Sequence, residues 1–222
     1  MSRGLATASD LGRLPSVARR QEPWRRDRIL DAALKSLADQ PAEAIRIADV
    51  AEKAGVSPAS VHYHFGDLSG LILAAVDRAS NEMFDERARA ISLLDDPAAK
   101  LDRLIEMGVP DEATPALVIM YTAIHAIRAD EAAVRAARVH VYKQDDLYAA
   151  VIKEGLSRGD FEPQGSPHFI ASSLVALEDA YDLYLVVGVA VDGAEGRSQL
   201  RQYAANTLGT GRRRTGGSAA NE

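Results

Sequence analysis

Apolar residues recur at helical spacing along most of this chain, and this pattern restricts the fold more than any other feature of the sequence. The clearest example is the segment 167–190. Its apolar and aromatic residues follow one another at steps of four and three: Ile170, Leu174, Leu177, Tyr181, Tyr184 and Gly188. No stretch shows the alternation of apolar and polar residues that a half-buried strand requires. The sequence therefore predicts an all-α fold.

Turn-forming residues divide the pattern into separate helices. We predict helices at 24–38, 47–54, 68–94, 98–107, 113–129, 131–158, 167–190 and 195–208, with a two-turn helix that starts after Ser57. Polar, Gly-rich segments precede and follow them, and these are typical of disordered tails. The predicted organisation is a disordered tail at 1–22, a small helical head at 23–66, a larger helical body at 67–208 and a second disordered tail at 209–222.

Composition excludes several classes of protein. The chain has 222 residues and no cysteine, so disulfides, thiolate metal sites and a cysteine nucleophile are ruled out. Its longest apolar stretch, Leu183 to Val191, is far short of the roughly 20 residues of a membrane span, and the N-terminus lacks an apolar signal region. No hydrolase elbow, phosphate-binding loop or zinc motif is present. We expect a cytoplasmic protein that is not an enzyme and has no cofactor, no metal and no membrane partner.

The charge is distributed unevenly along the chain. The net charge is -6, which by itself argues against a nucleic-acid partner. Residues 1–66, however, carry ten Lys and Arg against eight Asp and Glu, or +2, whereas residues 67–222 carry sixteen against twenty-four, or -8. A DNA-contacting head on an acidic body is compatible with this distribution.

Two short predicted helices meet at the sequence Ala54-Gly55-Val56-Ser57, which has the spacing of a helix-turn-helix. Such a turn needs a residue that accepts positive φ, which Gly55 supplies, and a small apolar residue beneath it, which Val56 supplies. Ser57 is a good N-cap, and the free backbone N–H groups at a helix start can face a phosphate. The motif indicates DNA binding through the second helix.

The segment IADVAEKAGVSPASVHYHFGDLSGLILAAV, preceded by RRDRILDAALKSLADQPAEAIR, resembles the N-terminal domain of the TetR family of transcriptional repressors over about residues 25–80. The family signature at the end of the recognition helix matches Tyr63-His64-Phe65. The resemblance implies a three-helix DNA-binding head, a helical body that dimerises and binds a small molecule, and a repressor that is released from a palindromic DNA operator by its ligand. The sequence does not distinguish a repressor from an activator.

The resemblance also implies roles for individual residues. The positions expected to approach base edges are Pro58, Ala59 and His62. The positions expected to touch the phosphate backbone are Arg46, Ser57, Ser60, Tyr63 and His64. Two residues depart from the family pattern: Leu68 stands where a phosphate-binding Lys is common, and His62 stands where an aromatic residue is common.

The body contains polar and aromatic residues among aliphatic ones, a composition typical of a ligand pocket and also of an ordinary core. The candidate pocket residues are Met83, Phe84, Met107, Met120, Tyr121, His125, Tyr142, Glu178 and Tyr181. A cationic or hydrogen-bonding ligand fits this set. The sequence does not choose between pocket and core.

A homodimer is expected because a single two-turn recognition helix makes few contacts, and two-fold operators require two of them. The predicted dimer interface contains Ile170, Leu174, Leu177, Tyr181, Tyr184, Leu200 and Tyr203. The alternative is that these residues pack within their own chain. The function predicted from the sequence is ligand-responsive DNA binding; the alternative is a helical small-molecule-binding or protein-interaction module without DNA binding.

Overall fold

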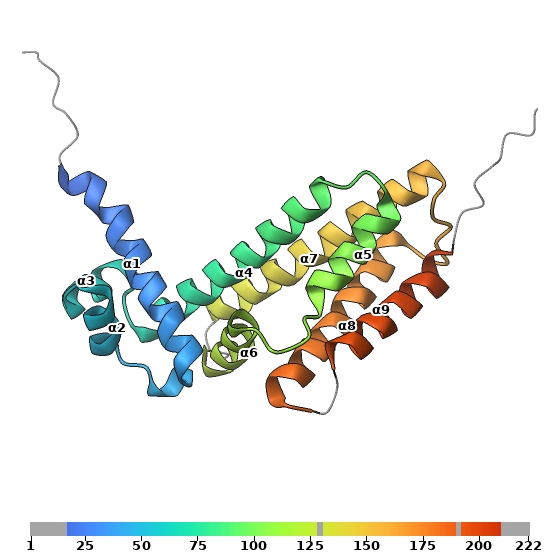
Figure 1. Ribbon diagram of the computed structural model, residues 1–222. Helices are drawn as coiled ribbons and strands as arrows, with labels where there is room; N and C mark the ends of the chain where they lie inside the picture. Colours follow the sequence, from blue (N-terminus) through green and yellow to red (C-terminus); the bar gives the residue numbers. More distant parts are fainter. Residues whose placement is uncertain (1–16, 128–130, 190–191, 210–222) are drawn as a thin grey trace, which may run out of the picture.

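The computed structural model describes residues 17–127, 131–189 and 192–209, and within these ranges the chain forms nine α-helices and no strand (Figure 1). The predicted all-α class is confirmed. The helices are α1 (Val17–Asp39), α2 (Ile47–Ala54), α3 (Pro58–Phe65), α4 (Leu68–Ser92), α5 (Pro97–Gly108), α6 (Pro115–Ile127), α7 (Glu131–Arg158), α8 (Pro167–Val187) and α9 (Gly193–Leu208), with a short 3-10 turn at Ala42–Ala44. The predicted tails at 1–16 and 210–222 lie outside the described residues.

Two of the predicted boundaries are wrong. Helix α1 begins at Val17, so residues 17–22 are helical and are not part of a disordered tail. Arg, Gln and Glu in this stretch are good helix formers, and they continue the helix backwards from Trp24. Helix α8 ends at Val187 rather than at 190, because Gly188 takes a left-handed conformation with φ of 73° and releases the chain from the helix.

The starts of five helices follow from capping side chains. In each case a side-chain oxygen accepts a hydrogen bond from the backbone N–H three residues later, which satisfies one of the free donors at a helix start. The capping residues are Ser57 for α3, Asp67 for α4, Asp96 for α5, Ser166 for α8 and Asp192 for α9. These caps explain why the sequence located most of the helix starts within a few residues.

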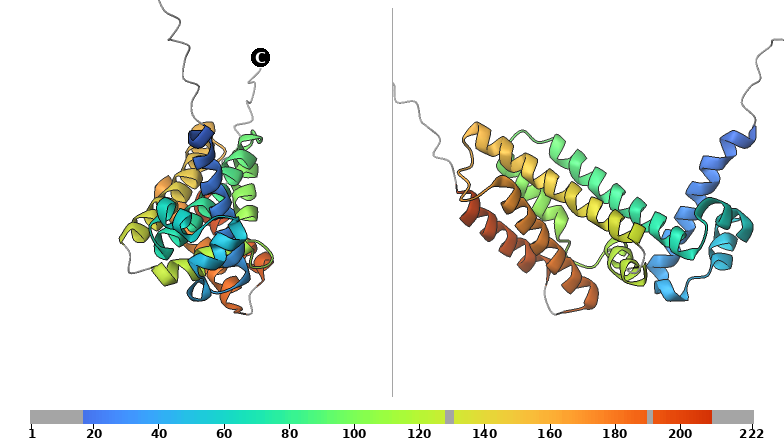
Figure 2. Two further views of the ribbon diagram at one scale, coloured as in Figure 1. Left: turned by 90° about the vertical axis from the view of Figure 1, so that its left-hand side faces the viewer. Right: turned by 180° about the vertical axis from the view of Figure 1, so that it is seen from behind.

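The head, formed by α1, α2 and α3, lies at one end of an elongated body (Figure 1). Helix α4 leads from the head along the body beside α7, and α8 and α9 run side by side on another face (Figures 1 and 2). Helix α6 lies where the body meets the head (Figure 1). None of the helices in the described part of the chain combines the length and apolar content that a membrane span requires.

One hydrophobic cluster joins the head to the body. It contains buried residues of α1, α2 and α3, together with Leu71, Ile72 and Ala75 of α4. Ile119 and Ala123 of α6 belong to the same cluster. The predicted head and body therefore share a core, and a movement of α4 or α6 displaces residues on which the head packs.

A second cluster holds α5, α7, α8 and α9 together, and it corrects the predicted dimer interface. Ile170, Leu174 and Leu200 are at most 1% exposed and lie inside this cluster of their own chain. Their assignment to a dimer interface is wrong, because the regular seam on α8 faces the neighbouring helices. Leu177, Tyr181 and Tyr203 also pack against the cluster but are only partly buried, and Tyr184 is 41% exposed.

A buried ion pair lies at the centre of the body. Arg87 of α4 donates to both carboxylate oxygens of Glu178 on α8, at 2.5 and 3.0 Å. The Tyr148 hydroxyl of α7 donates to Glu178 at 2.8 Å, and Arg87 also donates to the Leu104 carbonyl of α5 at 3.2 Å. Burial alone would lower the pKa of Arg87, but the Glu178 carboxylate outweighs this and raises it. Four helices are thus tied to one charged pair.

We predict that removing one member of the Arg87–Glu178 pair lowers the free energy of unfolding more than replacing both members with apolar residues. Arg87→Met leaves the Glu178 carboxylate buried without its cation and is expected to lower the free energy of unfolding by about 3–5 kcal/mol. The double variant Arg87→Met/Glu178→Leu removes both charges and should regain most of that loss. Urea unfolding followed by circular dichroism measures both values; equal losses in the single and double variants would contradict the prediction.

Candidate nucleic-acid interface and ligand pocket

The turn between α2 and α3 has the geometry that the sequence predicted. Gly55 adopts a left-handed conformation with φ of 63°, and its N–H donates to the carbonyls of Ala51 and Glu52. The Val56 N–H donates to Ala51 at 2.9 Å. Buried Val50 and Val61 pack the two helices together, so the angle between them is fixed by a closed turn and a small core.

The predicted DNA-contacting residues lie on the surface of this unit. Tyr63 is 75% exposed, which is more than Tyr142 and Tyr184. Ser60 and His64 are half-buried. The remaining positions are all exposed: Arg46, Ser57, Pro58, Ala59 and His62. Their contact with DNA stays a prediction.

The two histidines of α3 have different partners. The His62 ring is placed with Nδ1 at 2.8 Å from the Gly66 carbonyl. A carbonyl only accepts, so Nδ1 carries the proton and the outer Nε2 of the neutral ring is an acceptor. The His64 ring packs edge-on against Tyr63, with 5.1 Å between the ring centroids. Nowhere in the described ranges do three His, Asp or Glu side chains come together as a metal site would require.

Cationic and apolar side chains of the neighbouring helices complete the head. The Arg26 guanidinium lies 5.4 Å from the centroid of the Phe65 ring, and Arg28 lies 4.7 Å from that of Trp24. Both contacts are of the cation–π type and hold the arginines against the head. Leu68, which stands where the family commonly has Lys, packs partly buried against the head cluster. Its contribution is therefore to packing.

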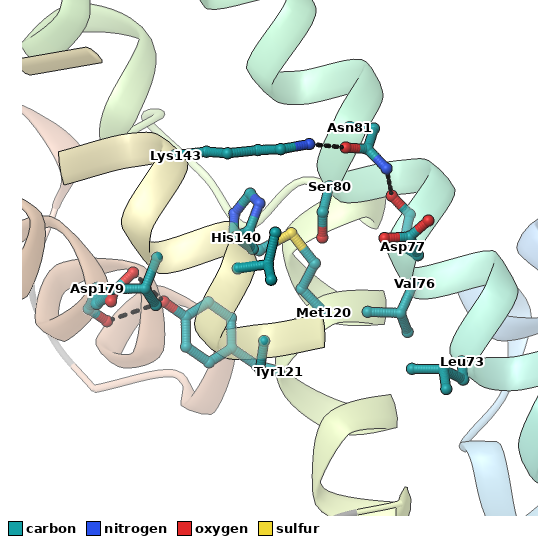
Figure 3. Close-up of a pocket in the computed structure, with 13 residues that line it drawn as sticks. Leu73, Val76, Asp77, Ser80, Asn81, Met120, Tyr121, His140, Lys143 and Asp179 are labelled. Carbon is teal, nitrogen blue, oxygen red and sulfur yellow. Dashed lines mark hydrogen bonds between the residues drawn. The ribbon is translucent and has the colours of Figure 1, made fainter. Parts of the chain in front are cut away.

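A pocket of about 160 Å³ opens between α4, α6 and α7, with one residue from α8 at its edge (Figure 3). Its lining is largely apolar. The lining residues are Leu73, Val76, Asp77, Ser80, Asn81, Met120, Tyr121, Ala137, Val139, His140, Val141, Lys143 and Asp179.

Two of the nine predicted pocket residues, Met120 and Tyr121, line this pocket. Six others do not line it: Met83 in the first cluster, Phe84 beside Lys143, half-buried Met107, exposed Tyr142, ion-paired Glu178 and Tyr181 in the second cluster. The His125 side chain lies outside the described residues.

Sequence reasoning missed the polar residues of the pocket, above all Asp179. A signal was available, because Glu178, Asp179 and Asp182 place three carboxylates within two turns of an otherwise apolar helix. Carboxylates on a helix that is hydrophobic nearly all round are rarely left without a partner or a role.

Burial changes the acidity of this group. The Tyr121 hydroxyl donates to the backbone carbonyl of Asp179 at 3.1 Å and to its carboxylate at 3.3 Å. Desolvation and the neighbouring Glu178 charge raise the pKa of Asp179 to about 6, even though Asp179 is exposed at the surface of its helix. The same two causes raise the pKa of Asp182, which is 5% exposed, to about 8.

Residues 29–75 match the family model of the bacterial regulatory proteins of the tetR family. These residues cover most of α1, all of α2 and α3, and the start of α4. Residues 29–75 are therefore a TetR-type N-terminal DNA-binding domain. The expectation from the sequence motif is confirmed.

Curated TetR-type relatives extend the match somewhat further. The chain is 30% identical over 113 residues to the HTH-type transcriptional regulator BetI of Rhizobium meliloti, an alignment that covers 50% of this chain and 55% of the relative. It is 28% identical over 105 residues to BetI of Agrobacterium fabrum, covering 47% and 51%. The chain thus matches about half the length of these relatives.

Solved structures show that the fold extends over the body. A transcriptional regulator from Saccharomonospora viridis in complex with choline superposes with a TM-score of 0.73 and 22% identity, covering 84% of this chain and 98% of that chain. A TetR transcription regulator from Haloarcula marismortui gives 0.74 at 21% identity, covering 84% and 99%. At this level of identity the likeness establishes the TetR-type fold alone.

We predict that Asp182 makes stability depend on pH in the sense opposite to an ordinary carboxylate. Its pKa is raised in the folded chain to about 8, so between pH 5 and 7 the folded state keeps a proton that the unfolded state has lost. Its contribution to unfolding free energy should therefore fall with rising pH, at most by about 1.4 kcal/mol per unit.

The variant Asp182→Asn removes this contribution. It should differ little from the parent chain at pH 4 and be more stable at pH 8, as measured by thermal unfolding at a series of pH values. Asp85→Asn, a change of an exposed carboxylate on α4, is the control. Parallel stability curves for the parent and Asp182→Asn chains would contradict the prediction.

Proposed function

We propose that this protein is a transcriptional regulator that binds a two-fold DNA operator through α3 and responds to a small molecule held in the pocket of the body. The observation that carries the proposal is the exposed surface of α3 on a closed helix-turn-helix, within the residues that match the TetR family. The curated relatives are named transcriptional regulators.

Individual contacts follow from the geometry of α3. Tyr63 projects from the head and is the proposed phosphate contact, because its hydroxyl can donate to a phosphate oxygen. His62 is the proposed base reader. With Nδ1 held by the Gly66 carbonyl, its Nε2 accepts a hydrogen bond; adenine N6 and cytosine N4 are the donors that the major groove offers.

A different face of α8 replaces the predicted dimer interface. Its exposed residues form an apolar stripe at steps typical of one helix face: Phe169, Ala176, Leu183 and Val187. Apart from Glu195 in the first turn, the exposed positions of α9 are uncharged: Ala194, Ser198, Gln199, Gln202, Ala205 and Asn206. Depletion of charge at the centre of a patch is typical of interface cores. We assign this face to the second copy that two-fold DNA recognition requires.

The pocket is the proposed effector site. Helix α6 contributes Met120 and Tyr121 to the pocket and Ile119 and Ala123 to the cluster under the head. A ligand that moves α6 or α4 therefore displaces residues on which the head packs, and the two recognition helices of a dimer lose their spacing of about 34–36 Å. The neighbour from Saccharomonospora viridis is in complex with choline, which supports a small-molecule effector for a protein of this fold. We favour a repressor that its ligand releases.

The DNA contacts are tested by two substitutions with different expected effects. Tyr63→Phe should weaken binding to every sequence alike and leave the salt slope unchanged, because the tyrosine hydroxyl is uncharged and displaces no counterion. His62→Ala should relax the preference at one base position, by about 1–3 kcal/mol, and leave the salt slope unchanged. Operator fragments selected from random duplexes, titrated by fluorescence anisotropy at several salt concentrations, measure both effects.

Tyr142→Phe is the matched control, since Tyr142 is an exposed tyrosine of α7, far along the chain from the head. It should leave affinity and salt slope unchanged. The proposal fails if the parent chain selects no sequence from the random pool, or if both α3 variants bind like the control.

The dimer face is tested by placing a charge on its stripe. Leu183→Glu should convert the dimer into a monomer in analytical ultracentrifugation while helical content is retained, because Leu183 is 43% exposed in its own chain. Affinity for a two-half-site operator should then fall at least tenfold. Leu93→Glu, which changes an 81% exposed leucine at the end of α4, should remain dimeric. If the Leu183→Glu chain remains dimeric, this face of α8 is not the dimer interface.

A further inference from the structure

Three charged side chains from three helices line the pocket: Asp77 of α4, Lys143 of α7 and Asp179 of α8. Asp179 of α8 and Lys143 of α7 both line it, and Figure 3 shows them approaching from separate directions. Among the described residues neither one forms an ion pair with any partner. A pocket with separated and uncompensated charges is prepared for a ligand that is itself polar at two ends.

At the acidic end, the Tyr121 hydroxyl donates to Asp179 and orients its carboxylate. The Tyr121 ring lies at the pocket wall. Behind it lies Asp182, whose Oδ1 is buried and has no hydrogen-bond partner in the described part of the chain. Glu178 is neutralised by Arg87, whereas Asp179 and Asp182 form no ion pair with any residue that the structure describes. This end therefore attracts positive charge.

The basic end is held by a hydrogen-bond relay. The Lys143 ammonium donates to Asn81 Oδ1 at 2.7 Å and lies 5.6 Å from the centroid of the Phe84 ring. Asn81 in turn donates to the Asp77 carbonyl at 2.8 Å. Only one of the three ammonium protons is used by Asn81. Burial, together with the charges of Arg87 and Lys143, lowers the pKa of nearby His140 and keeps that ring neutral.

The rest of the lining is mainly apolar, and it includes Val76, Met120 and Val139. The volume of about 160 Å³ is close to the roughly 150 Å³ of an engineered cavity that accommodates benzene. A ligand of about the size of benzene therefore fits the pocket.

We infer that the pocket takes a small organic ammonium compound, with its cationic group between the Tyr121 ring and the Asp179 carboxylate and a hydrogen-bond-accepting oxygen at Lys143. An alkylated ammonium suits an aromatic and carboxylate wall through cation–π attraction and charge. This inference deepens the proposed function, because it names the effector class of the proposed site.

The experiment compares three probes that separate charge from shape. Choline has the cation and the oxygen, 3,3-dimethylbutan-1-ol has the same shape without the charge, and tetramethylammonium has the charge without the oxygen. Isothermal titration of the full-length protein at pH 8, above the pKa of about 6 of Asp179, should give tightest binding for choline. The neutral alcohol should bind at least tenfold more weakly, and tetramethylammonium several-fold more weakly.

Three variants test which end of the pocket binds the ammonium group and which binds the oxygen. Asp179→Asn should weaken choline at least tenfold and leave the neutral alcohol unchanged. Lys143→Met should remove the preference for choline over tetramethylammonium without reducing the affinity for tetramethylammonium. Asp85→Asn removes the same charge from an exposed site on α4 and should bind choline like the parent chain. Circular dichroism confirms that each variant is folded.

The inference is overturned if the neutral alcohol binds as tightly as choline, if none of the probes binds at millimolar concentration, or if Asp179→Asn and Asp85→Asn behave alike. DNA is absent from these titrations. If the protein binds choline but selects no operator, the proposed DNA-binding function is contradicted and this inference stands. If it binds an operator but no cation, only this inference is contradicted.

Discussion

The arrangement of the body depends on the ion pair between Arg87 and Glu178. A charged pair that is only a few per cent exposed adds little net stability compared with apolar residues, but it penalises any packing that separates its members. Because Tyr148 and the Leu104 carbonyl bind the same pair, the helices α4, α5, α7 and α8 have one favourable register. The shape of the adjacent pocket depends on that register.

Neighbouring carboxylates on α8 illustrate how local environment divides the roles of similar residues. Glu178 points to Arg87 and is a structural anion, whereas Asp179 points toward α6 and the pocket edge (Figure 3). Asp182 is buried one turn later without a cation, so its pKa is raised to about 8. Within two helical turns, Glu178 is paired with a cation, Asp179 lines the pocket and Asp182 has a raised pKa. Only the first of these three carboxylates is needed for the fold.

The sequence was sufficient for the helices and the head, and insufficient for the pocket. Capping residues such as Ser57 and Asp67 act locally, so they predict helix starts without knowledge of the tertiary fold. The regular spacing of Ile170 and Leu174 predicts a buried stripe equally well, but periodicity does not tell whether the covering helix belongs to the same chain. Pocket residues depend on how four helices meet, and Asp179 and Lys143 become neighbours of one cavity only after folding.

The link from pocket to head is carried by packing rather than by charge. Arg78 of α4 pairs with Asp31 of α1 at 3.0 Å, but the Asp31 side chain is 52% exposed, and such pairs contribute about 0–1 kcal/mol. The cluster in which Ile119 and Ala123 of α6 meet the buried residues of the head is almost fully desolvated. A close-packed contact of this kind does not deform continuously, so a shift of α6 by a ligand at Tyr121 has to be followed by the head or has to break the cluster. We propose that the head follows α6, which would couple the position of α3 to occupancy of the pocket.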